Sequence, residues 1–254
     1  MHRTTSALSS LVLALLFAVF SAAQVPQAGA PRFDVATIKP AHSTEPTGFR
    51  ASKGRLETQS TSIVDMLKFS YGVHAAQILG LPEPLKNQRF DVVGTVAGQE
   101  VKIDLVKSMM RTLLAERFHL QLHPDRKELP VYVLEVEKAG SDLKPAAHEL
   151  LVPSVAYGPG VLQAGDASMH DLATFLQRYV TDRPVLDQTH KDGRYDLQLL
   201  WSPDLGAPQR ANGATEDYPD LFTAIRQQLG LRLVAKREMA DVLVIDNVTQ
   251  PTDN

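Results

Sequence analysis

The same pattern of residues occurs twice in this chain, which restricts the fold to one that two copies of a single unit can build. Residues of the first copy return at a constant offset of 106 positions: Gly54, Leu56, Ser62, Asp65 and Phe69 are matched by Gly160, Leu162, Ser168, Asp171 and Phe175. Further on, "RFDVVGTV" at 89–96 is echoed at an offset of 105 by "RYDLQLLW" at 194–201. The constant offset and the shared order of segments indicate two tandem repeats.

Each copy starts its first helix with a serine and an aspartate spaced as in a capping box. Ser62 and Ser168 stand directly before apolar residues of helical spacing, and Asp65 and Asp171 follow three positions later. In a capping box the serine hydroxyl accepts a bond from the backbone N–H three residues on, and the later side chain returns to the serine N–H. We therefore expect these four residues to be structural helix caps.

The other segments of each copy favour a strand, a second helix and two short closing strands. The closing strands are expected at 119–123 and 131–136 in the first copy, and at 231–235 and 242–248 in the second. Each helix has one apolar stripe and each strand one apolar face. The predicted fold class is therefore α+β, with two tandem repeats of a strand–helix–strand–helix–strand–strand unit and helices packed on small mixed sheets.

The expected organisation has four parts. Residues 1–23 are a signal peptide, residues 24–138 form the first α+β repeat together with an N-terminal strand, and residues 160–254 form the second repeat. Between the repeats, residues 139–159 contain several prolines and glycines and favour a linker.

The N-terminal segment predicts export. Arg3 precedes an apolar run at 11–20, and small residues at Ser21 and Ala23 suit cleavage before Gln24. The run is too short to span a bilayer comfortably, and no later run is long enough, so we expect a soluble periplasmic or extracellular protein without a membrane span.

Composition narrows the classes of chemistry. The chain has no cysteine, which excludes disulfides, thiolate metal sites and thiol nucleophiles. Of 26 basic residues, loss of Arg3 leaves 25 against 29 acidic ones, a net charge of −4. With no basic run, the sequence does not predict nucleic-acid binding.

A short polar motif also recurs. Arg89 and Asp91 return as Arg194 and Asp196, two positions apart on one face of an expected strand. Because the motif occurs in both copies, we interpret it as structural, with ion pairs along the strand face. We identify no catalytic, cofactor-binding or metal-binding residues and expect no cofactor.

Two other groups of side chains leave alternatives open. His119 and His123 share a face of an expected strand, and could contribute to a metal site only with a third ligand that no nearby motif supplies. The aromatic residues Tyr71, Tyr179, Trp201 and Tyr218 could line a ligand groove or fill the core.

The segments "FDVATIKP", "SIVDMLKFSYGV", "LLAERFHLQLH" and "ELPVYVLEV" resemble a soil-associated family of uncharacterised secreted bacterial proteins, which is expanded in acidobacteria. In some relatives a similar domain is joined to a membrane metallopeptidase, which implies an envelope or sensing role. A weaker resemblance, in the capped helix, leucine-rich helix and closing strand, is to the short N-terminal domain of secretins and TonB-dependent receptors. That resemblance implies periplasmic protein contacts.

Three functions follow as hypotheses. The first is a non-enzymatic exported binding module that contacts an envelope protein or a small envelope-derived ligand. The second is a sensory domain that works with a membrane peptidase or regulator. The third is an exported hydrolase whose site carries no recognisable motif, and a buried cluster of carboxylates or histidines with displaced pKa values would favour it.

Overall fold

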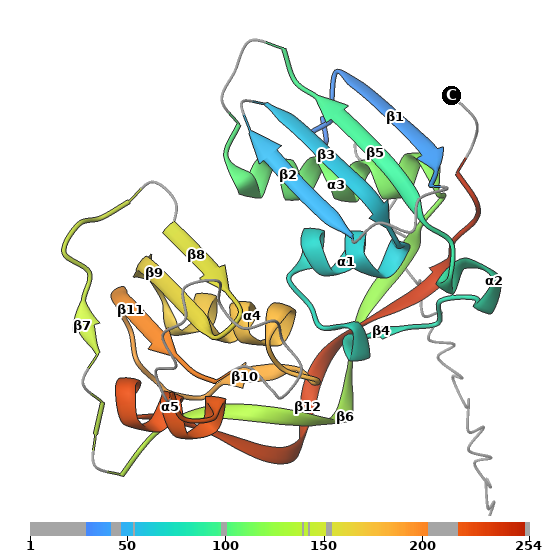
Figure 1. Cartoon of the computed structure of the whole chain (residues 1–254). Helices are drawn as coiled ribbons and strands as arrows, with labels where there is room; N and C mark the ends of the chain where they lie inside the picture. The colour runs from blue at the N-terminus through green and yellow to red at the C-terminus, as the bar shows by residue number, and fades with distance from the viewer. Residues whose placement is uncertain are drawn as a thin grey trace, which may run out of the picture.

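The computed structural model describes residues 29–41, 47–52, 54–97, 101–138, 140–141, 143–150, 154–202 and 218–251. These residues form twelve strands in three four-stranded sheets and five α-helices, a mixed α+β fold. Figure 1 shows two lobes, each with its own sheet, joined by the two long strands β6 and β12. The predicted signal peptide, residues 1–23, lies outside the described residues.

The first lobe is built on an antiparallel sheet. Its strands, in spatial order, are β1 (Val35–Pro40), β5 (Phe90–Thr95), β3 (Arg55–Thr61) and β2 (Gly48–Ser52). Its helices are α1 (Ile63–Tyr71), the single-turn η1 (Ala75–Gln77), α2 (Glu83–Lys86) and α3 (Ile103–Arg117). Strand β5 alternates between buried and half-buried residues, so its buried face meets the apolar stripes of α1 and α3 in one core.

The second lobe is built on a sheet ordered β7-β11-β9-β8. These strands span Lys144–Pro145, Tyr195–Leu200, Val161–Ala167 and Ser154–Gly158. Its helices are α4 (Met169–Tyr179) and α5 (Leu221–Leu229). Both β7 and β8 fall within 139–159, the range predicted as a linker. Strand β8 forms there because Pro159 and Gly160 provide a two-residue turn that pairs it with β9.

The third sheet connects the lobes and differs from the sequence prediction. Each pair of predicted closing strands is one continuous strand, β6 (Gln121–Val136) and β12 (Leu231–Asn247). They pair antiparallel from Leu231 opposite Val136 to Asn247 opposite Gln121. The prediction of two short strands was wrong because the charged stretch between the apolar runs does not interrupt pairing. That stretch is mostly exposed, and cross-strand pairs such as Arg237 with Glu128 suit it to solvent.

This ribbon carries each long strand from one lobe into the other. Leu122, near the start of β6, lies in the first core, whereas Leu134, near its end, lies in the second. Strand β12 runs the other way, with Leu231 in the second core and Ile245 in the first. Each lobe therefore takes core residues from both halves of the sequence.

Two short strands complete the third sheet. Strand β10 (Val185–Asp187) pairs parallel with the end of β6, and β4 (Ile78–Leu79) pairs parallel with the end of β12. Within the described part of the chain, no helix is both long and apolar enough to cross a membrane.

Candidate functional site

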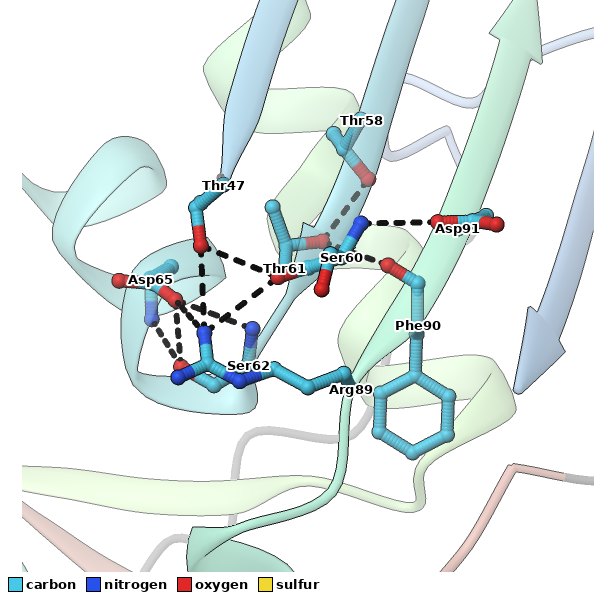
Figure 2. Close-up of polar contacts among 9 residues, drawn as sticks. All are labelled: Thr47, Thr58, Ser60, Thr61, Ser62, Asp65, Arg89, Phe90 and Asp91. Atoms are coloured by element: carbon cyan, nitrogen blue, oxygen red, sulfur yellow. Dashed lines mark hydrogen bonds and ion pairs between the residues drawn. The ribbon is translucent and has the colours of Figure 1, made fainter. Parts of the chain in front are cut away.

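The recurring polar residues of the first half surround an irregular turn of backbone, drawn in Figure 2. The register between β3 and β5 shifts between Thr58 and Thr61, and Ser60 has a φ of 50°, which is uncommon for a residue with a Cβ. Asp91 Oδ1 accepts a hydrogen bond from the Ser60 N–H at 2.8 Å, and Arg89 Nη1 donates to the Ser60 carbonyl at 3.3 Å. The two charged residues thus hold both backbone groups of the strained position.

The same arginine connects this position to the start of α1. Ser62 is the N-cap, its Oγ accepting from the Asp65 N–H at 3.1 Å while Asp65 Oδ2 accepts from the Ser62 N–H at 3.0 Å. Arg89 Nη1 lies 3.2 Å from Asp65 Oδ2 and 3.2 Å from Thr47 Oγ1. We call Ser60, Ser62, Asp65, Arg89 and Asp91 the first clamp.

The second half contains the same arrangement, which we call the second clamp: Asp166, Ser168, Asp171, Arg194 and Asp196. Asp166 has a φ of 54°, and its N–H donates to Asp196 Oδ1 at 3.1 Å. Arg194 donates to the Asp166 carbonyl and lies 3.9 Å from Asp171 Oδ2. Ser168 caps α4 and forms the capping box with Asp171. The second clamp therefore does for α4 what the first does for α1.

The clamps differ at one position. Ser60 corresponds to Asp166, whose side chain is 2% exposed and forms an ion pair with Arg194 Nε at 2.7 Å. The Leu150 N–H donates to the other oxygen of Asp166 at 2.8 Å. Ser60 and Asp166 are 106 positions apart, the same offset as the matched residues. Their correspondence is not visible in the sequence because the residue types differ.

The ion pairs are not those expected along the strand face. Arg89 pairs with Asp65, and Arg194 with Asp166, while Asp91 and Asp196 accept bonds from backbone N–H groups. Bonds from the N–H groups of Ala147 and Asp166 lower the pKa of Asp196. The polar atoms of both clamps are thus engaged in holding backbone.

The two histidines have different side-chain partners. His123 Nδ1 lies 2.9 Å from Asp246 Oδ2, whereas His119 Nδ1 lies 3.1 Å from Thr249 Oγ1. Over the residues that the structure describes, no group of three or more metal-binding side chains comes together.

Aromatic rings gather where the two lobes meet. Tyr157 of β8 and Tyr179 of α4 have ring centroids 4.5 Å apart, and Tyr157 also lies edge-on to Phe175 at 5.3 Å. The guanidinium of Arg178 is 5.0 Å from the Tyr179 ring and 5.3 Å from that of Phe69 on α1. We call this set the aromatic row: Phe49, Phe69, Phe175, Arg178, Tyr179 and Tyr157.

The aromatic row is held in place by a contact between α1 and α4. Gln177 Nε2 donates to the Gly72 carbonyl at 2.6 Å, and its Oε1 accepts from the Val185 N–H. Two side chains of the row remain accessible: Tyr157 is 55% exposed and Tyr179 is 46% exposed. Partial burial raises the pKa of Tyr179 to about 12, so its hydroxyl stays protonated at neutral pH and can donate a hydrogen bond.

The aromatic residues named from the sequence separate into different surroundings. Tyr179 belongs to the aromatic row, whereas Tyr71 is half-buried beneath the Arg111 guanidinium, at 5.3 Å from its ring centroid. Trp201 is buried in the second core. Trp201 is therefore a core residue, whereas the rings of Tyr71 and Tyr179 each contact an arginine.

A family model for a protein of unknown function, DUF3738, matches residues 64–248, more than two thirds of the chain. The chain belongs to the DUF3738 family. The matched range begins inside α1 and ends just after β12, so the DUF3738 region takes in both clamps' helices and the connecting ribbon. No curated protein and no solved structure matches this DUF3738 chain.

Proposed function

We propose that this DUF3738 protein is an exported, non-enzymatic interaction module, built from two tandem repeats, that binds a protein of the cell envelope. The observation that carries the proposal is the exposed part of the aromatic row. Tyr157 and Tyr179 present large rings to solvent beside Arg178. Tyrosine and arginine are among the residues that contribute most binding energy in protein interfaces.

The state of the carboxyl groups supports a binding role over a hydrolytic one. A general acid that works near neutral pH needs a raised pKa, produced by burial or by a neighbouring negative charge. In the described ranges, every carboxyl with a displaced pKa is displaced downward: Asp125, Glu135, Asp182, Asp196 and Asp220. The pKa of Asp220 is lowered first by a side-chain hydrogen bond from Thr223, and those of the other four by hydrogen bonds from cations or backbone N–H groups. Such bonds suit structural roles.

The proposals of a tandem repeat and of export are both based on the sequence. The order of strands and helices in the two halves is consistent with a repeat. The order β3-α1-β4-β5-α3-β6 in one half corresponds to β9-α4-β10-β11-α5-β12 in the other, apart from the short η1 and α2. Export is supported by the basic and apolar N-terminal segment and by the resemblance to secreted bacterial proteins.

Site-specific photo-crosslinking tests this function. A benzophenone amino acid would replace Tyr157 in the full chain, produced in its own cells, and a second chain would carry it at Met239 in the ribbon, which is 48% exposed. The proposal requires a discrete envelope-protein adduct from position 157 that is absent from position 239. Identical adducts from both positions, or none from position 157, would refute an interface at the aromatic row.

A further inference from the structure

Among the described residues, strand β8 is an outer edge of the second sheet that no other strand covers. It is the last strand in the order β7-β11-β9-β8, and four of its five residues are exposed and the fifth half-buried. Natural edge strands are usually shielded by charged residues, prolines or short length. The sequence of β8, "SVAYG", has no charge and no proline.

The other outer edges of the first two sheets carry such protection. Strand β1 includes Lys39 and ends at Pro40, strand β2 contains Arg50, and strand β7 is only two residues long. Because β8 differs from these three edges, its open backbone calls for a specific explanation.

The register of the hairpin shows which backbone groups point outward. Gly158 and Val161 pair across the two-residue turn, so they exchange the hydrogen bonds that close it. Hydrogen-bonded and non-hydrogen-bonded pairs alternate along an antiparallel ladder. Val155, opposite Ala164, and Tyr157 are therefore in non-hydrogen-bonded pairs, and their N–H and C=O groups point away from β9. Among the described residues, no other element forms a backbone hydrogen bond to them.

The side chains of the same two residues form an apolar strip on the helix-facing side. Val155 is 45% exposed, and Tyr157, at 55%, rests against Phe175 and Tyr179 of α4. Their partners on β9, Ala164 and Leu162, are buried. A strand placed beside β8 would thus extend both the hydrogen-bond ladder and the apolar face of the sheet.

We propose that β8 binds an extended segment of a partner protein by strand addition, with apolar or aromatic side chains at alternate positions of that segment packed against Val155 and Tyr157. A row of N–H and C=O groups at strand spacing is complemented by another extended backbone, which commits the site to a polypeptide. Neighbouring residues on the same face of two strands contact each other, which selects the alternating apolar pattern. The inference rests on the proposed function only in that the partner is a protein.

Two variants distinguish the contribution of the outward backbone N–H to binding from that of the side chains of β8. Val155→Pro removes one outward N–H and leaves the bonds to β9 in place, a position where edge strands tolerate proline. Ala156→Ser changes the side chain on the opposite face of the same strand, keeps the backbone N–H and adds no charge, so it is the matched control. Circular dichroism and Trp201 fluorescence would establish that both variants fold.

The probe is a display library of random peptides selected against the full chain, with affinities of synthesised winners measured by fluorescence anisotropy. We expect alternating apolar residues in the selected peptides. Val155→Pro should weaken binding on the order of tenfold, since it removes a hydrogen bond and obstructs the incoming strand, whereas Ala156→Ser should leave the affinity unchanged. Amide exchange at Val155 and Tyr157 should slow when peptide is bound.

The remaining outcomes overturn the proposal that β8 binds a segment of a partner protein. They are failure to select a peptide, binding that is insensitive to Val155→Pro, and self-association of the chain through β8, detected as a dimer by light scattering and lost in Val155→Pro. If the envelope adduct at position 157 persists in the Val155→Pro variant, the proposed interaction function stands and strand addition alone fails.

Discussion

Replacing Arg194 with methionine should destabilise the protein far more than the same change at Arg89, although the two arginines occupy corresponding places. Methionine keeps the apolar stem of either side chain and removes the guanidinium. In the second clamp this leaves the carboxylate of Asp166, 2% exposed, without its ion-pair partner. In the first clamp the corresponding residue is Ser60, which carries no charge.

The magnitudes follow from the contacts that remain. Removing one partner of a fully buried ion pair costs about 3–5 kcal/mol. Asp166 keeps the hydrogen bond from the Leu150 N–H, and the Arg194 side chain is 41% exposed, so water can solvate part of the site. We therefore expect a loss of about 2–3 kcal/mol for Arg194→Met. Arg89→Met should cost about 0.5–1 kcal/mol, because its pair with Asp65 is partly exposed and Thr47 still donates to the Ser60 carbonyl.

Urea denaturation followed by fluorescence of Trp201 measures this difference. Trp201 is the single tryptophan and is buried in the second core, so it reports on the lobe that contains Arg194, while circular dichroism follows both lobes. Adding Asp166→Ser to Arg194→Met removes the unpaired buried carboxylate, which makes the site comparable to the first clamp in Arg89→Met, and should recover most of the lost stability. Equal losses in the two single variants, or no recovery in the double variant, would refute the role given to the buried carboxylate.

Three further predictions concern the caps, a histidine and the crossing strands. Ser62→Ala and Ser168→Ala should each lower the free energy of unfolding by about 1 kcal/mol through the lost N-cap; unchanged urea midpoints would contradict this. Burial, and next the charge of Lys68, lowers the pKa of His74. As the pH falls, His74 therefore takes up a proton in the unfolded chain before it does so in the folded protein. The free energy of unfolding should decrease as the pH falls below about 6.5. In His74→Gln, urea midpoints measured across this pH range should depend less on pH. Leu134→Ala, at a fully buried position, should lower the free energy of unfolding by about 2–5 kcal/mol. Because Leu134 lies in the second core, amide exchange should accelerate in α4 more than in α1. Faster exchange in α1 than in α4 would contradict the passage of β6 from the first lobe into the second.

Local features of the fold could be read from the sequence because they depend on neighbours along the chain. The caps at Ser62 and Ser168 need only a residue three positions away. The fold class followed from apolar periodicity for the same reason. The partners of Arg89 and Arg194 were not predictable, because Ser60 and Asp166 reach them only after β3 and β9 pair with the neighbouring strands.

The sequence by itself determined the mixed α+β class and the capped starts of α1 and α4. Only the tertiary structure decided that β6 and β12 each run through both lobes, because the charged middle of each strand is acceptable only when the other lies beside it. It also decided that Arg178 of one lobe stacks over Phe69 of the other, and that β8 is left as an open edge. These features depend on residues that are far apart in the chain, so no local sequence pattern predicts them.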